Sequence, residues 1–129
     1  MTHKKIKEAL GTTSWDESYG YYFTIDYDGD ELHGSLDYTK EVLDNPDLVQ
    51  VKKIINKLKA QDDRAHTLIQ KTYPEEDISE LLLSDLILHQ DGSFSLGYDT
   101  GDDSAGSLFV YIRFNSDFSM EEELIYETY

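Results

Sequence analysis

The sequence predicts an α+β domain in which an N-terminal β-hairpin and a four-stranded antiparallel meander flank a long amphipathic helix. An aromatic and β-branched run followed by an Asp-Gly turn indicates the hairpin, and apolar residues at helical spacing indicate the helix. Alternating apolar residues between turn signals indicate the meander. We expect a single domain over residues 1–129, because this length suits one hydrophobic core.

The hairpin is predicted from residues 18–28 and 31–39, which are joined by the turn Asp28-Gly29-Asp30. Ahead of it, residues 6–10 are compatible with either a short helix or a strand. Gly11 would end a helix there, because glycine readily adopts the left-handed conformation of a helix C-terminus.

The central helix is predicted to begin at Asn45-Pro46 and to reach Lys71. Asn is a favourable N-cap, and Pro at the first helical position gives up an N–H that has no partner. The polar run Gln61-Asp62-Asp63 interrupts the apolar stripe, so a division into two helices stays open. Pro74, followed by three acids, predicts one further short helix.

The meander is predicted from residues 83–89, 94–99, 107–114 and 122–129. A turn over residues 90–93 joins the first two strands, and residues 100–106 are expected to form a loop. No repeat, linker or low-complexity segment is apparent.

The net charge of −16 is unevenly distributed. Residues 8–39 carry −8 and residues 72–129 carry −13, whereas residues 1–7 carry +3 and the helical segment 40–71 carries +2. The negative charge therefore belongs to the predicted strands and turns. It argues against binding to nucleic acid phosphates or to an anionic membrane, and it favours a basic partner.

The sequence also bears on the cellular compartment of the protein. The absence of cysteine excludes disulfides and thiolate metal sites and is compatible with a reducing compartment. No apolar run follows the N-terminal lysines, and none is long enough to span a bilayer. We therefore expect a cytoplasmic protein.

The sequence contains only weak matches to metal-binding and catalytic motifs. The acidic run at residues 26–31 invites a calcium interpretation, but its glycine is at the wrong position for a calcium-binding helix-loop-helix. Asp99-Thr100-Gly101 matches the tripeptide of aspartic proteases without the rest of that fold's pattern. No Ser-nucleophile or phosphate-loop motif occurs.

The histidines are similarly uninformative, because none has a sequence partner at metal-ligand spacing. They are His3, His33, His66 and His89. We expect no catalytic residue, no metal and no cofactor, although a metal-dependent enzyme built from dispersed acids stays open as an alternative.

The order of elements resembles a group of small bacterial cytoplasmic proteins. The resemblance rests on Leu10-Gly11 followed by Trp15 and an aromatic strand, then the amphipathic helix, then the segment ISELLLSDLILHQDGSFSLGYDTGDDSAGSLFVYIRF. Members of that group are regarded as immunity proteins of polymorphic or contact-dependent toxin systems. The resemblance implies a non-catalytic protein that binds and neutralises a toxin, and it assigns no functional residue.

Charge and resemblance together suggest a surface that blocks the basic cleft of a nuclease toxin. The candidate partner-binding residues are two acidic patches with two tyrosine anchors, namely Asp99, Asp102 and Asp103, then Asp28, Asp30 and Glu31, and finally Tyr19 and Tyr21. An alternative is a nucleic-acid mimic that inhibits a DNA-binding protein, which would require carboxylates spaced like phosphates. The sequence leaves the oligomeric state open.

Overall fold

The computed structural model describes residues 3–75, 81–103 and 106–128, with the backbone alone along 100–103, 106–108 and 127–128. In chain order its elements are α1 (Lys4–Leu10), β1 (Thr12–Asp16), β2 (Tyr21–Tyr27), β3 (Asp30–Asp37), α2 (Lys40–Asp44), α3 (Leu48–Asn56), α4 (Leu58–Thr72), β4 (Leu83–His89), β5 (Phe94–Asp103), β6 (Gly106–Phe114) and β7 (Ile125–Thr128).

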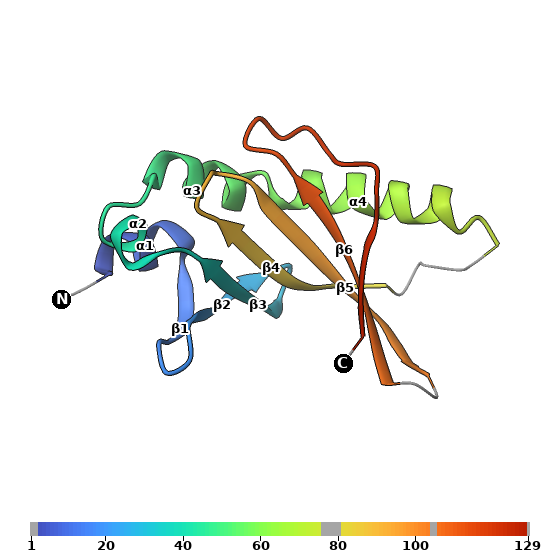
Figure 1. The fold of residues 1–129 in the computed structure, drawn as a ribbon, viewed down its shortest axis with the longest axis horizontal. Coiled ribbons are helices and arrows are strands. Elements are labelled where there is room, and N and C mark those ends of the chain that lie inside the picture. Colours follow the sequence, from blue (N-terminus) through green and yellow to red (C-terminus); the bar gives the residue numbers. More distant parts are fainter. Residues whose placement is uncertain (1–2, 76–80, 104–105, 129) are drawn as a thin grey trace.

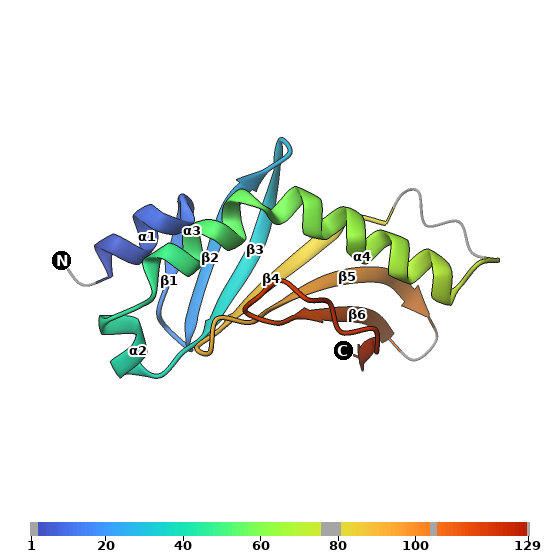
Figure 2. The same ribbon diagram turned by 90° about the horizontal axis from the view of Figure 1, so that it is seen from above.

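The strands form one sheet in the order β1-β2-β3-β4-β5-β6-β7, so every strand lies beside its neighbours in sequence. All neighbouring pairs are antiparallel except β3 and β4, which are parallel. The chain must therefore travel back along the sheet between β3 and β4. Helices α3 and α4 make this return along one face (Figures 1 and 2).

The predicted fold class is wrong. The strand pair around Asp28–Asp30 is no separate hairpin, because it continues into β1 on one side and into β4 on the other. The predicted meander strands belong to the same sheet, which is mixed and seven-stranded. The spacing of apolar residues predicts the length of a helix. It does not predict at which end of the sheet the following strand begins. The parallel β3–β4 junction was therefore not visible in the sequence.

The long helix is also corrected. Helix α3 begins at Leu48, where the side chain of Asp47 accepts the backbone N–H of Gln50, while Asn45 instead follows the last turn of α2. The break falls at Lys57 between α3 and α4 and not at Gln61–Asp63. Gln61 and Asp62 lie inside α4 with buried side chains, so tertiary contacts hold these polar residues in the helix.

The N-terminal segment 6–10 falls within helix α1. Gly11 ends this helix with φ +69°, and its N–H bonds the carbonyl oxygens of Lys7 and Glu8. The strand β1 that follows was not expected, and residues 17–20 form a bend before β2. Strand β5 continues to Asp103 and strand β6 begins at Gly106. Both strands therefore include residues that were predicted to form a loop. The helix predicted after Pro74 falls mostly outside the described residues.

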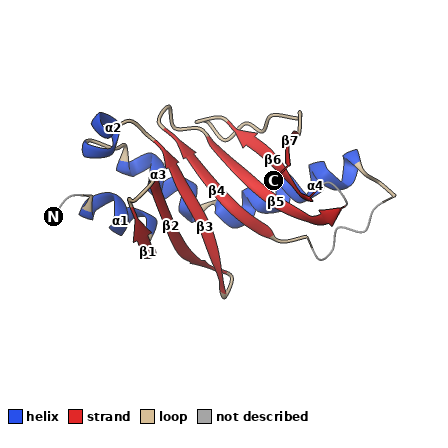
Figure 3. Cartoon of the chain, turned by 60° about the horizontal axis from the view of Figure 1, so that its bottom comes forward, coloured by secondary structure: helices blue, strands red, loops and turns tan. Residues whose placement is uncertain are grey.

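The molecule has two layers, with the helices on one face of the sheet and the opposite face turned outward (Figure 3). The core lies between the layers. Strands β4, β5 and β6 supply its centre, where Leu86, Leu96 and Ile112 are fully buried. The segment after β6 folds onto the helix side, since Arg64 bonds the carbonyl oxygen of Phe118.

Candidate functional site

An open cleft of about 760 Å³ lies between the tip of the β2–β3 turn, helix α4 and the start of β4. Five acids and one lysine line it, together with aromatic, histidine and apolar side chains. The lining residues are Tyr27, Asp28, Asp30, Glu31, Leu32, His33, Lys59, Asp62, Asp63, His66, Thr67, Leu81, Leu82, Leu83 and Ser84. We call this site the acidic cleft.

The β2–β3 turn places the carboxylates at the mouth of the acidic cleft. Asp28 and Gly29 have φ values of +54° and +86°, as in the tight turns that join twisted antiparallel strands. Asp28, Asp30 and Glu31 are all exposed. Leu82 is exposed at another part of the cleft. Carboxylates beside an apolar wall suit a long basic side chain, whose methylene groups and charged head can each find a matching surface.

Asp62 brings a carboxyl group into the interior at the base of this cleft, where the residue is 6% exposed. The hydroxyl of Tyr27 donates to its Oδ2 over 2.7 Å, and the hydroxyl of Tyr98 donates to its Oδ1 over 2.5 Å. His66 Nε2 lies 3.5 Å from Oδ1. The buried carboxyl oxygens are thus satisfied by partners from β2, α4 and β5.

The same contacts change the acidity of the tyrosines. Burial raises the pKa of both Tyr27 and Tyr98, and the hydrogen bond to Asp62 raises it further. Both phenols therefore stay protonated and continue to donate at physiological pH. The base of the acidic cleft is consequently a polar network in which two phenols donate to one carboxylate.

The topology brings both predicted acidic patches to the same end of the sheet. The β2–β3 turn is at the start of β3, and β4 begins at that end because it runs parallel to β3. β5 is antiparallel to β4, so residues 99–103 also lie at this end. The two patches are separated by β4, and only Asp28, Asp30 and Glu31 line the acidic cleft.

The patch on β5 is only partly described. Asp99 is exposed and pairs with Phe109 across the sheet. Asp102 and Asp103 pair with Ser107 and Gly106 through the backbone, and their side chains lie outside the described residues.

The two predicted tyrosine anchors differ in their surroundings. Tyr19 is 94% exposed in the bend before β2, at the end of the sheet opposite the acidic cleft. Tyr21 is half-buried, with its ring centroid 6.0 Å from that of His3 and 6.5 Å from that of Trp15. Tyr21 therefore packs in part against neighbouring rings, and its role as an anchor stays a prediction.

Sequence reasoning missed the contribution of α4 to this site. Lys59, Asp62, Asp63 and His66 all line the acidic cleft. The available signal was the polar run at residues 61–63, for which we left a division into two helices open. A carboxylate at a position that the helical period assigns to the buried face is instead a reason to look for buried hydrogen-bond donors.

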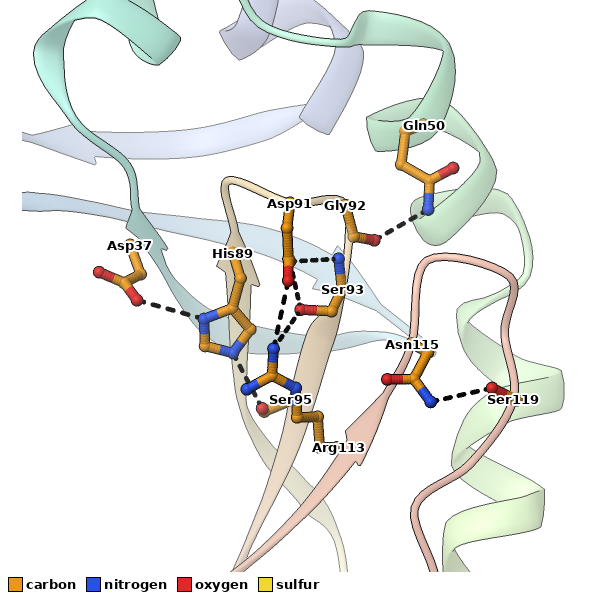
Figure 4. A network of polar contacts seen from close by, with 10 residues as sticks. All are labelled: Asp37, Gln50, His89, Asp91, Gly92, Ser93, Ser95, Arg113, Asn115 and Ser119. Atoms are coloured by element: carbon orange, nitrogen blue, oxygen red, sulfur yellow. Dashed lines mark hydrogen bonds and ion pairs between the residues drawn. The ribbon is translucent and has the colours of Figure 1, made fainter.

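A second polar network occupies the opposite end of the sheet (Figure 4). His89 lies between Asp37, at 3.2 Å from Nδ1, and Ser95, at 3.1 Å from Nε2. This is the order of a Ser-His-Asp triad. However, the side chain of Ser95 is buried, because the residue is only 6% exposed. Its strand is paired on both sides, with Ile87 and Arg113 opposite Ser95, so its backbone groups belong to the hydrogen bonds of the sheet. We interpret the array as a cross-strand tie.

Neighbouring contacts support that interpretation. Arg113 donates to the hydroxyl of Ser93 over 2.9 Å, and Ser93 donates to Asp91 through both its hydroxyl and its backbone N–H. These two bonds lower the pKa of Asp91. Gln50 of α3 bonds the carbonyl oxygen of Gly92, which connects the helix layer to this turn.

Across the described residues, no group of three or more His, Cys, Asp or Glu side chains is arranged to hold a metal ion. In the same part of the chain, no helix combines the length and the apolar character needed to cross a membrane. Comparison with protein-family models, with curated proteins and with solved structures finds no significant match to this chain.

Proposed function

We propose that the protein is a non-catalytic immunity protein that acts in the cytoplasm, where it binds and neutralises a basic nuclease toxin. The observation that carries the proposal is the acidic cleft, in which exposed carboxylates from the β2–β3 turn lie beside apolar side chains and a hydrogen-bonded network around Asp62. Such a site needs no reacting group. Its chemistry fits lysine or arginine side chains of a partner protein.

The charge distribution supports the same partner. A nuclease must present a basic surface to phosphate groups, and this chain gathers acids from two segments distant in sequence at one end of its sheet. Complementary potentials accelerate association and suppress binding to acidic proteins. An inhibitor that covers a nuclease cleft therefore benefits from the distribution that would prevent it from binding nucleic acid itself.

The test is co-expression with the toxin domain encoded by the neighbouring gene. We expect the two proteins to co-purify and cells that produce the toxin domain to survive only when this protein is present. If the purified proteins do not associate, or if association gives no protection, the proposal is wrong.

Charge reversal tests the acidic cleft itself. Asp30→Lys combined with Glu31→Lys should slow association about tenfold or more at low salt, since steering depends on the local potential. The matched control is Glu41→Lys with Asp44→Lys, which makes the same charge change at exposed residues of α2 outside the cleft. Equal effects of the two variants would show that only net charge matters and would contradict a role for the cleft.

A further inference from the structure

The sheet face opposite the helices is uncovered by any described element (Figure 3). Strand alternation places every second residue there. On β2, for example, Phe23 and Ile25 are buried under the helices, while Tyr22 and Asp26 point outward and are exposed. We call this surface the open face. A two-layer fold that leaves a sheet of seven strands uncovered presents a broad, rigid surface.

The open face is apolar over β4, β6 and β7. Ile87, Phe109, Tyr111 and Ile125 alternate with core residues, and register places Tyr111 directly beside Ile125. The rings of Phe109 and Tyr111 stack with centroids 6.4 Å apart. Ile125 is exposed and Ile87 and Phe109 are half-buried, whereas Tyr111 is buried and its hydroxyl donates to Asp85 over 3.2 Å. Aromatic and aliphatic side chains of this kind form the centres of protein interfaces.

Acids surround this apolar centre. Asp37 and Asp85 lie on β3 and β4, where they already contact His89 and the hydroxyl of Tyr111. Asp99 lies on β5 beside Phe109, and Arg113 is a base on the same face of β6. Next to Asp85, short side chains such as Ser35 leave a hollow of about 310 Å³ that Asp16 and Tyr22 also line. The charge of the rim is complementary to a basic protein.

We infer that the toxin domain lies over the open face, with the apolar centre as its main contact and the surrounding acids, continuous with the acidic cleft through His33, as the rim. This inference rests on the proposed function and locates its interface. His33 lines both the acidic cleft and the hollow beside Asp85, so one partner can reach both. An apolar centre and a charged rim make different kinetic contributions, because rim charges act on association and buried apolar contacts act on dissociation.

Kinetics of the purified pair test this arrangement. Ile87→Ser with Ile125→Ser should raise the dissociation rate about tenfold or more and leave the association rate nearly unchanged, because no charge is altered. Val49→Ser is the matched control, since Val49 is an exposed apolar residue of α3 in the helix layer. An unchanged dissociation rate in the double variant would overturn the inference, while the proposed function would survive if the wild-type pair still binds.

A second measurement avoids any effect on folding. The chain contains no cysteine, so Ser35→Cys on the open face and Val49→Cys on α3 can each be labelled uniquely with a bulky maleimide after folding. We expect the label at residue 35 to prevent toxin binding and the label at residue 49 to leave it intact. Binding that tolerates the label at residue 35 would place the interface elsewhere. A wild-type protein that fails to bind would instead refute the proposed function.

Discussion

At the residue scale, the carboxyl group of Asp62 links the acidic cleft to the core. Its two oxygens accept from Tyr27 and Tyr98, and Tyr98 is fully buried. Asp62→Ala leaves both hydroxyl groups without this acceptor, so we expect a loss of about 2–4 kcal/mol in the free energy of unfolding, measured by urea denaturation.

The neighbouring acid supplies the control for that prediction. Asp63 is exposed and lies 3.6 Å from Lys59 one helical turn away. Asp63→Ala should change the free energy of unfolding by less than about 0.5 kcal/mol, as usual for a surface ion pair. If Asp62→Ala lowers the free energy of unfolding no more than Asp63→Ala does, the buried network contributes no more stability than a surface ion pair.

Gly97 provides a second prediction at this scale. A Cβ atom at residue 97 would lie 2.6 Å from Cε1 of Tyr111 and 3.0 Å from Cβ of Asp85, so the ring of Tyr111 uses the space above the glycine. Gly97→Ala should destabilise the protein by about 1–3 kcal/mol. In a Tyr111→Ala background the same change should cost clearly less, and an additive double-mutant cycle would disprove this steric explanation.

At the element scale, the start of α3 depends on one side chain. Asp47 accepts the N–H of Gln50 over 3.1 Å and satisfies one of the unpaired donors of the first turn. Asp47→Ala should lower the free energy of unfolding by about 1 kcal/mol. Asn45→Ala, at the N-cap position expected from sequence, should cost less than half as much, and the reverse order would restore that expectation.

The sequence was informative about elements where local chemistry decides them. The turn at Asp28–Asp30 forms because Asp and Gly tolerate the left-handed conformation, and α1 ends at Gly11 for the same reason. It was less informative where two residues compete for one role. Asn45 and Asp47 are both good N-caps, and their relative positions in the folded chain decide between them.

The residues of the candidate site also differ in how far the sequence predicts them. Acids in a tight turn must be exposed, so Asp28, Asp30 and Glu31 could be selected without a structure. The contribution of Asp62 depends on hydroxyl groups 35 and 36 residues away along the chain, and no local pattern reports such contacts. The mixed sheet was missed because strand direction depends on the path of the connecting helices.

At the scale of the whole molecule, the two layers differ in charge. Most of the basic residues belong to segment 40–71, which crosses the helix layer, while the acid-rich segments form the sheet, its turns and the segment 115–124 on the helix side. The charge of −16 therefore acts as a directed field and not as a uniform one. A basic partner that approaches from the open face meets acids first and the lysines of the helix layer last.

The tyrosines predict how the whole fold responds to alkaline pH. Burial and the nearby Asp47 raise the pKa of Tyr38 to about 12, against 10.0 for a free tyrosine. Below pH 10 this residue is protonated in both states and has no effect. Between pH 10 and 12 the unfolded chain loses its proton first, so stability falls as pH rises. Tyr27 and Tyr98, whose pKa values are also raised, act in the same direction.

Urea unfolding across this alkaline range measures the effect. Two pKa units at Tyr38 correspond to a loss of at most about 2 kcal/mol once partial exposure is allowed for. Tyr38→Phe cannot titrate, so its free energy of unfolding should fall less than that of the wild type between pH 10 and 12. Identical slopes for the two proteins would exclude Tyr38 as a source. Tyrosinate absorbance should rise in two stages, since the raised pKa values of Tyr27, Tyr38 and Tyr98 delay the ionisation of these three phenols beyond that of a free tyrosine.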